Sequence, residues 1–132
     1  MTSDHCKIDD RWIKNRGFII TIFKELVNTD IFCEIVGTKI VYHAIKELIN
    51  EFPQLLTEIW QNNTLGRTQF PFRDETALSF VVERKSTELT QFLIESGVDV
   101  WTHTISNIPD FNNPAKQIVL NKREYLILNK CI

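Results

Sequence analysis

The chain has 132 residues, of which 43% are hydrophobic and 24% are charged, and its formal net charge at pH 7 is −2. This composition excludes an intrinsically disordered chain, and the length suits one domain with a continuous core. The basic residues are scattered, and pairs such as Lys122-Arg123 are interpreted as solvated surface. Binding to nucleic-acid phosphates needs clustered Lys and Arg, so we expect no nucleic-acid partner.

The cysteines and the first residues indicate a cellular compartment. Cys6, Cys33 and Cys131 cannot all pair within one chain, and none lies in a CxxC spacing, which is typical of a reducing environment. Residues 1–10 are polar and charged, so they predict a flexible N-terminus and no secretory signal peptide. No apolar run approaches the roughly 20 residues of a membrane-spanning helix. We therefore expect a cytoplasmic or nuclear protein without a membrane segment.

Apolar residues recur at helical spacing through the first half of the chain. Asn28-Thr29-Asp30 predicts a break that caps a short following helix, and Pro53 suits the first turn of another helix. Residues 62–73 show no helical period and predict a loop. The helices expected here span residues 12–27, a short stretch to residue 35, 39–52 and 53–61.

The second half repeats this arrangement of short helices and long connections. Gly97 ends a predicted pair of helices, and residues 102–113 are polar and form the next connection. No segment predicts a convincing sheet, so the fold class is all-α with long connecting loops. The helices expected in this half span residues 76–84, 87–96, 114–120 and 123–131.

One segment, residues 74–100, carries a motif. Thr76-Ala77-Leu78-Ser79 opens its first helix, and Leu93-Ile94-Glu95-Ser96-Gly97-Val98-Asp99-Val100 closes its second. Together they closely resemble one ankyrin repeat, a β-turn and two antiparallel helices with T-P-L-H-x-A at the opening of the first helix. An ordinary helical hairpin in another kind of bundle is the alternative interpretation.

The matched residues have physical roles. Thr76 can cap the first helix, Gly97 can adopt a left-handed conformation at the end of the second, and Asp99 can turn the chain back. The segment also departs from the family pattern. Val81 and Val82 replace small alanines, and Lys85 replaces the glycine between the helices, which would cost about 1 kcal/mol in a left-handed turn.

Weaker likenesses lie on both sides of this segment. Residues 37–44 and 113–119 resemble the openings of neighbouring degenerate repeats, and residues 19–35 could form an N-terminal cap. The resemblance therefore implies a short ankyrin-type stack of about three repeats plus the cap, within a single domain over residues 11–132.

The resemblance implies a non-enzymatic protein-interaction module, an adaptor or inhibitor that binds another protein through loop tips and a concave face. The loop aromatics Phe72 and Trp101 could anchor a partner or fold back over their own loops. Carried onto this chain, the expected partner-binding residues are Phe72, Arg73, Glu75, Glu83, Arg84, Trp101 and His103.

Two alternatives remain. The apolar C-terminal residues Leu126, Ile127, Leu128 and Ile132 suit a structural subunit that packs through this end in a homo- or hetero-oligomer. A helical enzyme or ligand-binding protein is the other. No phosphate-binding loop, nucleophile motif or zinc spacing is present, so we expect no cofactor, no metal and no catalytic residues. His43 is interpreted as a core histidine.

Overall fold

The computed structural model of the protein describes residues 3–34, 39–61 and 74–130. These residues are mostly helical, which confirms the expected predominance of helix, and two strands of two residues each accompany the helices. The chain divides into two compact units, Met1–Leu55 and Leu56–Ile132. None of the described helices is both long enough and apolar enough to span a membrane.

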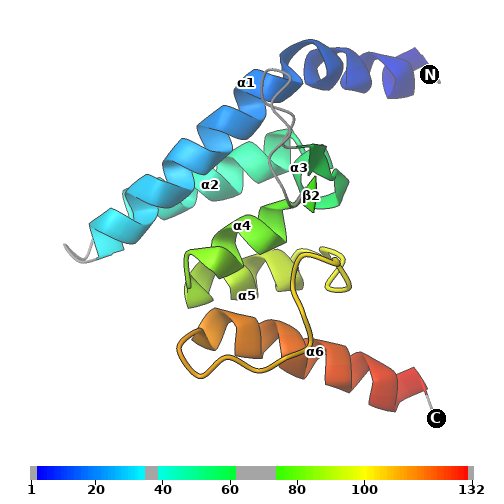
Figure 1. The fold of residues 1–132 in the computed structure, drawn as a ribbon. Coiled ribbons are helices and arrows are strands. Elements are labelled where there is room, and N and C mark those ends of the chain that lie inside the picture. Colours follow the sequence, from blue (N-terminus) through cyan, green and yellow to red (C-terminus); the bar gives the residue numbers. More distant parts are fainter. Residues whose placement is uncertain (1–2, 35–38, 62–73, 131–132) are drawn as a thin grey trace. The chain divides into compact units, whose positions relative to one another are not determined.

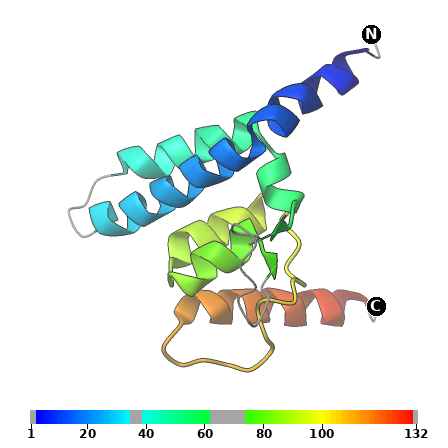
Figure 2. The same ribbon diagram turned by 45° about the horizontal axis from the view of Figure 1, so that its top comes forward.

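The first unit contains two antiparallel helices, α1 (Ser3–Glu34) and α2 (Ile40–Glu51), which lie side by side (Figures 1 and 2). α2 confirms the helix predicted over residues 39–52. The α1 backbone leaves helical geometry at Asn15 (φ −118°, ψ 15°), where the side-chain amide donates a 3.1 Å hydrogen bond to the Arg11 carbonyl. The buried apolar side chains of the two helices are Trp12, Ile19, Ile20, Phe23, Val27, Ile45 and Ile49.

α1 differs from the prediction near both of its ends. It is helical from Ser3, inside the segment expected to be flexible, and it continues through Asn28-Thr29-Asp30. The predicted break there is wrong. Thr29 Oγ1 donates a 2.8 Å hydrogen bond to the carbonyl of Glu25, one turn earlier, so its hydroxyl is satisfied within the helix instead of capping a new one.

The helix predicted over residues 53–61 is much shorter than expected. α3 spans only Gln54–Thr57, and β1 (Trp60–Gln61) then pairs antiparallel with β2 (Asp74–Glu75), with Trp60 opposite Glu75. The Trp60 ring is buried, with its centroid 6.2 Å from that of Phe80. Strand pairing and the burial of this ring therefore replace the last helical turns of the prediction.

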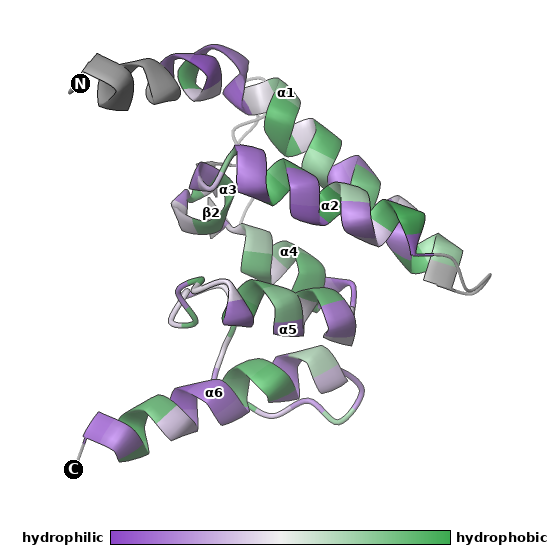
Figure 3. Ribbon diagram, turned by 180° about the vertical axis from the view of Figure 1, so that it is seen from behind, coloured by the Kyte–Doolittle hydropathy of each residue, from purple (hydrophilic) through white to green (hydrophobic). Residues whose placement is uncertain are grey.

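The second unit is built on a helical hairpin of α4 (Ala77–Glu83) and α5 (Thr87–Glu95), which confirms the two helices predicted there. Thr76 Oγ1 accepts the Ser79 N–H at 3.1 Å, and Ser79 Oγ accepts the Thr76 N–H at 2.9 Å. This reciprocal pair satisfies two backbone donors at the start of α4. Figure 3 shows hydrophobic colouring along most of α4, whose residues 77–82 are all buried.

Both predicted left-handed positions are present at the ends of these helices. Lys85 has a φ of 62° between α4 and α5, and Gly97 has a φ of 94° after α5. Ser86 caps α5 by accepting the Leu89 N–H at 3.3 Å. Asp99 Oδ1 then accepts the Trp101 N–H at 2.9 Å, which is the expected local turn.

α6 (Pro114–Lys130) is one continuous helix, so the prediction of two helices with a break at residues 121–122 is wrong. Its buried residues Ala115, Val119 and Arg123 are four residues apart and form one stripe. Asn113 Oδ1 caps the helix by accepting the Lys116 N–H at 3.1 Å, and Asn113 Nδ2 donates a 2.9 Å bond to the Val82 carbonyl. This side chain therefore connects the start of α6 to the end of α4.

Candidate functional site

The expected partner-binding residues lie at three places. Glu75 is on β2, Glu83 and Arg84 are at the end of α4, and Trp101 and His103 are in the connection between α5 and α6. Phe72 and Arg73 lie outside the described residues. The structure brings Trp101 and His103 into one cavity, whereas Glu83 and Arg84 lie at the opposite end of α4 from Glu75.

Arg84 is engaged with residues of its own helix. Its guanidinium carbon lies 3.5 Å from the centroid of the Phe80 ring, and Nη1 donates a 3.2 Å bond to the Phe80 carbonyl. The same nitrogen is 3.8 Å from the carboxylate of Glu83. These contacts hold the two charged side chains at the surface of α4. Neither side chain lines the cavity that contains Trp101 and His103.

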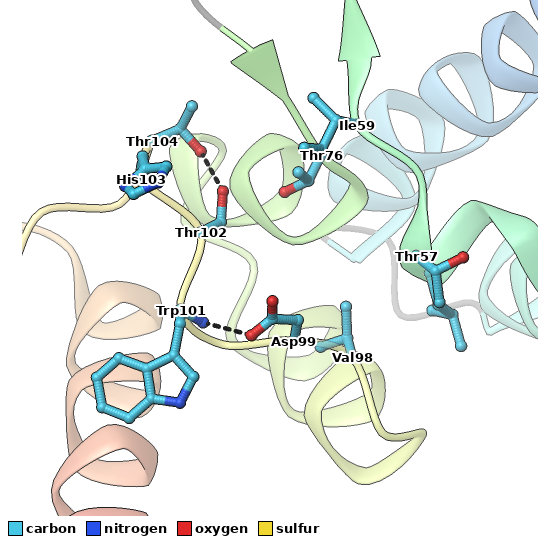
Figure 4. A pocket seen from close by; sticks show the side chains of 10 residues that line it. Thr57, Ile59, Thr76, Val98, Asp99, Trp101, Thr102, His103 and Thr104 are labelled. Atoms are coloured by element: carbon cyan, nitrogen blue, oxygen red, sulfur yellow. Dashed lines mark hydrogen bonds between the residues drawn. The ribbon is translucent and has the colours of Figure 1, made fainter.

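The cavity that contains Trp101 and His103 has a volume of about 240 Å³ and lies wholly within the second unit. We call it the threonine pocket (Figure 4), because four threonines from three segments of the chain line it. Its lining residues are Leu56, Thr57, Ile59, Thr76, Val98, Asp99, Trp101, Thr102, His103 and Thr104.

The polar groups of the threonine pocket are held in place by local hydrogen bonds. The hydroxyls of Thr102 and Thr104 are 3.0 Å apart, and the Asp99 carboxylate accepts the Trp101 N–H. Among the lining residues, Asp99 is the acid and there is no Lys or Arg. An array of hydroxyls and apolar side chains can bind a neutral group, but it offers no lysine or arginine for an anion.

Trp101 also lines a second hollow. The exposed fraction of Trp101 is 46%, and in Figure 4 its ring points away from the side chains of Thr102 and Thr104. This C-terminal hollow has a volume of about 450 Å³ and is lined by Trp101 with Leu126, Ile127, Asn129 and Lys130 of α6. The loop aromatic and the apolar end of α6, which the sequence suggested as separate interaction sites, therefore share a boundary.

Arg123 holds the Trp101 loop on α6, a role that the sequence analysis missed. Its side chain donates bonds of 2.6 Å to the Val100 carbonyl, 2.6 Å to Asn107 Oδ1 and 3.1 Å to the Thr102 carbonyl. The guanidinium carbon is 5.6 Å from the centroid of the Trp101 ring. Burial lowers the pKa of Arg123, and the negative charge of Asp99 opposes that effect by raising it.

The interpretation of Arg123 as solvated surface is therefore wrong. The residue is buried because three oxygen acceptors from residues 100–107 surround its guanidinium group. One sequence signal could have located it. Position 123 continues the four-residue spacing of Ala115 and Val119, so a charged residue stands on the buried stripe of an otherwise ordinary helix.

The last turns of α6 expose large side chains. Tyr125, Ile127 and Leu128 are more than half exposed, and Leu126 is half-buried. Figure 3 shows hydrophobic and hydrophilic segments alternating along this helix. Ile132, the fourth residue of the expected apolar end, lies outside the described residues. Single exposed apolar residues are ordinary on protein surfaces, but a group beside a hollow is typical of a contact surface.

The histidines and cysteines form no metal centre within the described ranges, where no group of three or more His, Cys, Asp or Glu residues could hold an ion. His43 is exposed, so its assignment to the core is wrong. The buried positions of α2 are Ile45 and Ile49, and a residue two places before Ile45 points to the other side of the helix. Cys33 is half-buried, and Cys131 lies outside the described residues.

The second unit therefore combines a pocket rich in hydroxyl groups with an exposed aromatic side chain and an apolar helix end. The residues that line the two hollows come from α3, the residue before β1, the start of α4, the connection after α5 and the end of α6. Comparison of the chain with protein-family models, curated proteins and solved structures gave no significant match.

Proposed function

We propose that this chain is a non-enzymatic protein-interaction module of the cytoplasm or nucleus, an adaptor or inhibitor that binds a partner protein around Trp101. The proposed contact area, called the Trp101 surface, consists of Trp101, His103, Leu126, Ile127 and Lys130. Of the expected contacts, Glu83 and Arg84 are left out of it, because they are engaged with Phe80 or with each other at the far end of α4.

The proposal includes an ankyrin-type architecture for residues 74–101, with degenerate repeats on either side. It is supported by the Thr76 and Ser79 cap, the antiparallel pair α4 and α5, and the left-handed Gly97. Packing of α6 against α5 is what a following repeat would supply. A stack of about three repeats plus a cap would place loops such as that of Trp101 along one edge, where a partner can reach them.

The observation that carries the proposal is the position of Trp101. The residue is 46% exposed, although its backbone N–H is held by Asp99 and the adjacent carbonyls are held by Arg123. An aromatic side chain held in place before binding loses little conformational entropy on association. Trp is among the residues most enriched at the energetic centres of protein interfaces.

A second candidate function is a structural subunit that packs through the end of α6. The observation that favours it is the exposure of Ile127 and Leu128, at 51% and 63%. Exposed apolar side chains that lie together on one helix are suited to burial by another chain. A second copy of this chain or a different subunit would serve equally.

The first experiment is affinity capture from a matched extract with wild type, Trp101→Ala and the control Phe111→Ala. Phe111 is a fully exposed aromatic in the same connection and lines neither hollow. A partner captured by wild type and Phe111→Ala should be lost with Trp101→Ala. With the purified partner, loss of a central aromatic should raise Kd by about 30-fold or more. Equal binding by all three proteins would refute the Trp101 surface.

Sedimentation of the isolated chain over a range of concentrations distinguishes the structural subunit from the adaptor. A structural subunit should self-associate, or associate with a captured chain, in a way that Leu128→Lys abolishes and Trp101→Ala weakens less. An adaptor should stay monomeric, and its partner binding should depend more strongly on Trp101 than on Leu128. Monomeric behaviour together with partner binding that neither substitution changes would exclude both candidates.

A further inference from the structure

The threonine pocket is adjacent to the Trp101 surface but has a chemistry of its own. We infer that it accepts one neutral phenolic ring, namely a tyrosine side chain that the partner inserts beside Trp101. This inference rests on the proposed function for the source of the tyrosine, whereas the chemistry of the pocket is a property of the chain alone.

The size of the pocket favours a single side chain. Its volume of about 240 Å³ lies below the roughly 300–1,000 Å³ of sites that enclose a drug-sized ligand. Apolar side chains of Leu56, Ile59 and Val98 contribute to its lining, so an occupant needs an apolar body. Figure 4 shows Ile59 and Thr76 on one side of the view and Thr102 and Thr104 on the other.

The charges at the pocket favour a neutral occupant. No Lys or Arg lines it, so a phosphate or carboxylate would lose its hydration with the imidazole of His103 as its one basic partner in the lining. A cation would have Asp99 as its acidic partner in the lining, but this carboxylate already accepts the Trp101 N–H and interacts electrostatically with Arg123. The carboxylate of Asp99 therefore already interacts with two groups of the chain, which makes it a weaker partner for a cationic occupant.

The remaining polar groups match a hydroxyl. A threonine hydroxyl can both donate and accept a hydrogen bond, and the pair of Thr102 and Thr104 shares one bond between its two oxygens. The pair therefore keeps lone pairs and one hydroxyl proton for an incoming group, and a phenol can serve as donor or acceptor to it. Among the aromatic residues that dominate interfaces, tyrosine alone joins an apolar ring to a hydroxyl.

The test is a titration of the whole chain with three fragment probes, p-cresol, toluene and n-propylguanidinium, followed by methyl chemical shifts in NMR spectra. p-Cresol should shift the methyl signals of Ile59, Val98 and Thr102, and toluene should bind about fivefold more weakly for lack of one neutral hydrogen bond. n-Propylguanidinium, which represents arginine, should cause no saturable shift at these methyl groups.

Variants connect the binding to the hydroxyl pair. Thr102→Val keeps the shape of the side chain and the carbonyl that Arg123 binds, and it should reduce p-cresol affinity to that of toluene. The control Thr87→Val changes an exposed threonine at the first residue of α5 that does not line the pocket, and it should leave p-cresol binding unchanged. Equal affinities for p-cresol and toluene, tighter binding of the guanidinium, or no shifts at the pocket would overturn the inference.

The two proposals fail separately. If p-cresol binds as expected but partner capture does not depend on Trp101, the pocket stands and the proposed function is wrong. If capture depends on Trp101 but p-cresol does not bind, the proposed function stands and the pocket does not hold a tyrosine. If both succeed, free p-cresol should compete with the partner in wild type and not in Thr102→Val.

Discussion

Substitution of Arg123 by methionine tests how the second unit holds its irregular segment. Methionine keeps most of the apolar stem and removes all three hydrogen bonds to Val100, Thr102 and Asn107. A hydrogen bond to a charged group contributes about 1.5–3 kcal/mol, so the three together contribute roughly 4.5–9 kcal/mol before desolvation. Removing a guanidinium from water costs several kcal/mol of this amount, in keeping with its lowered pKa.

We therefore expect Arg123→Met to reduce the free energy of unfolding of the second unit by about 3 kcal/mol, or about 150-fold in the opening equilibrium. Amide hydrogen exchange at Leu89 and Leu93 suits the measurement, because both residues are buried in α5 and report on this unit. Arg123→Lys should lose most of the same free energy, since one ammonium cannot reproduce the three directions of a guanidinium.

The neighbouring Lys122 provides the matched control for this prediction. Its ammonium nitrogen lies 5.0 Å from the centroid of the Tyr125 ring, and such a partly exposed contact contributes about 0.5–1 kcal/mol. Lys122→Met should therefore reduce stability by less than about 1 kcal/mol. If Arg123→Met and Lys122→Met have equal effects, water replaces the guanidinium at the carbonyls, and the idea that Arg123 fastens this segment is refuted.

Three further substitutions test the helix ends and the core. Thr76→Ala removes the Thr76 hydroxyl from the reciprocal cap of α4 and should reduce the free energy of unfolding by about 1 kcal/mol. Urea-dependent hydrogen exchange of the α4 amides measures this loss, and no loss would mean that Ser79 alone suffices. Lys85→Gly should stabilise the hairpin by about 0.5–1 kcal/mol, because φ at this position is 62°; a destabilised hairpin would contradict a strained lysine. Phe23 has no exposed surface, so Phe23→Ala should reduce the free energy of unfolding of the first unit by about 3–5 kcal/mol. Hydrogen exchange at the Ile45 amide measures this change, and a loss under about 1 kcal/mol would show that Phe23 is not a core residue.

The local features of the α4 and α5 hairpin could be predicted from the sequence because their causes are close together in the chain. Thr76 caps a helix that starts one residue later, and Gly97 ends one by adopting a conformation that other residues avoid. Even the unfavourable left-handed Lys85 could be placed, because both flanking helices fix where the turn must be.

The errors have causes that lie outside the local sequence. Thr29 has the same capping chemistry as Thr76, but its hydroxyl bonds to Glu25 within a helix that packs against α2. Trp60 continues the apolar pattern of a helix in the sequence, yet its backbone pairs with β2, where Glu75 lies opposite it.

The candidate site was predicted in part for the same reason. Trp101 and His103 could be chosen from loop position and residue type, and both line the threonine pocket. The acceptors around Arg123 come from residues 16 to 23 positions earlier in the chain, so no pattern near Arg123 could show them. The pocket itself combines segments that precede residue 62 and follow residue 73, which the sequence alone did not bring together.

The anchoring of the connection between α5 and α6 divides it into parts that should differ in their tolerance of inserted sequence. Arg123 holds the part from Val100 to Asn107, and Asn113 fixes the far end to the Val82 carbonyl. Ile108 and Pro109 between them are exposed. Because lengthening a closed loop costs only about 0.6 kcal/mol per doubling, an epitope tag or fluorophore sequence can be inserted after Ile108 without disturbing either anchor. This position therefore offers a labelling site in the same connection as Trp101, from which partner binding can be followed in solution.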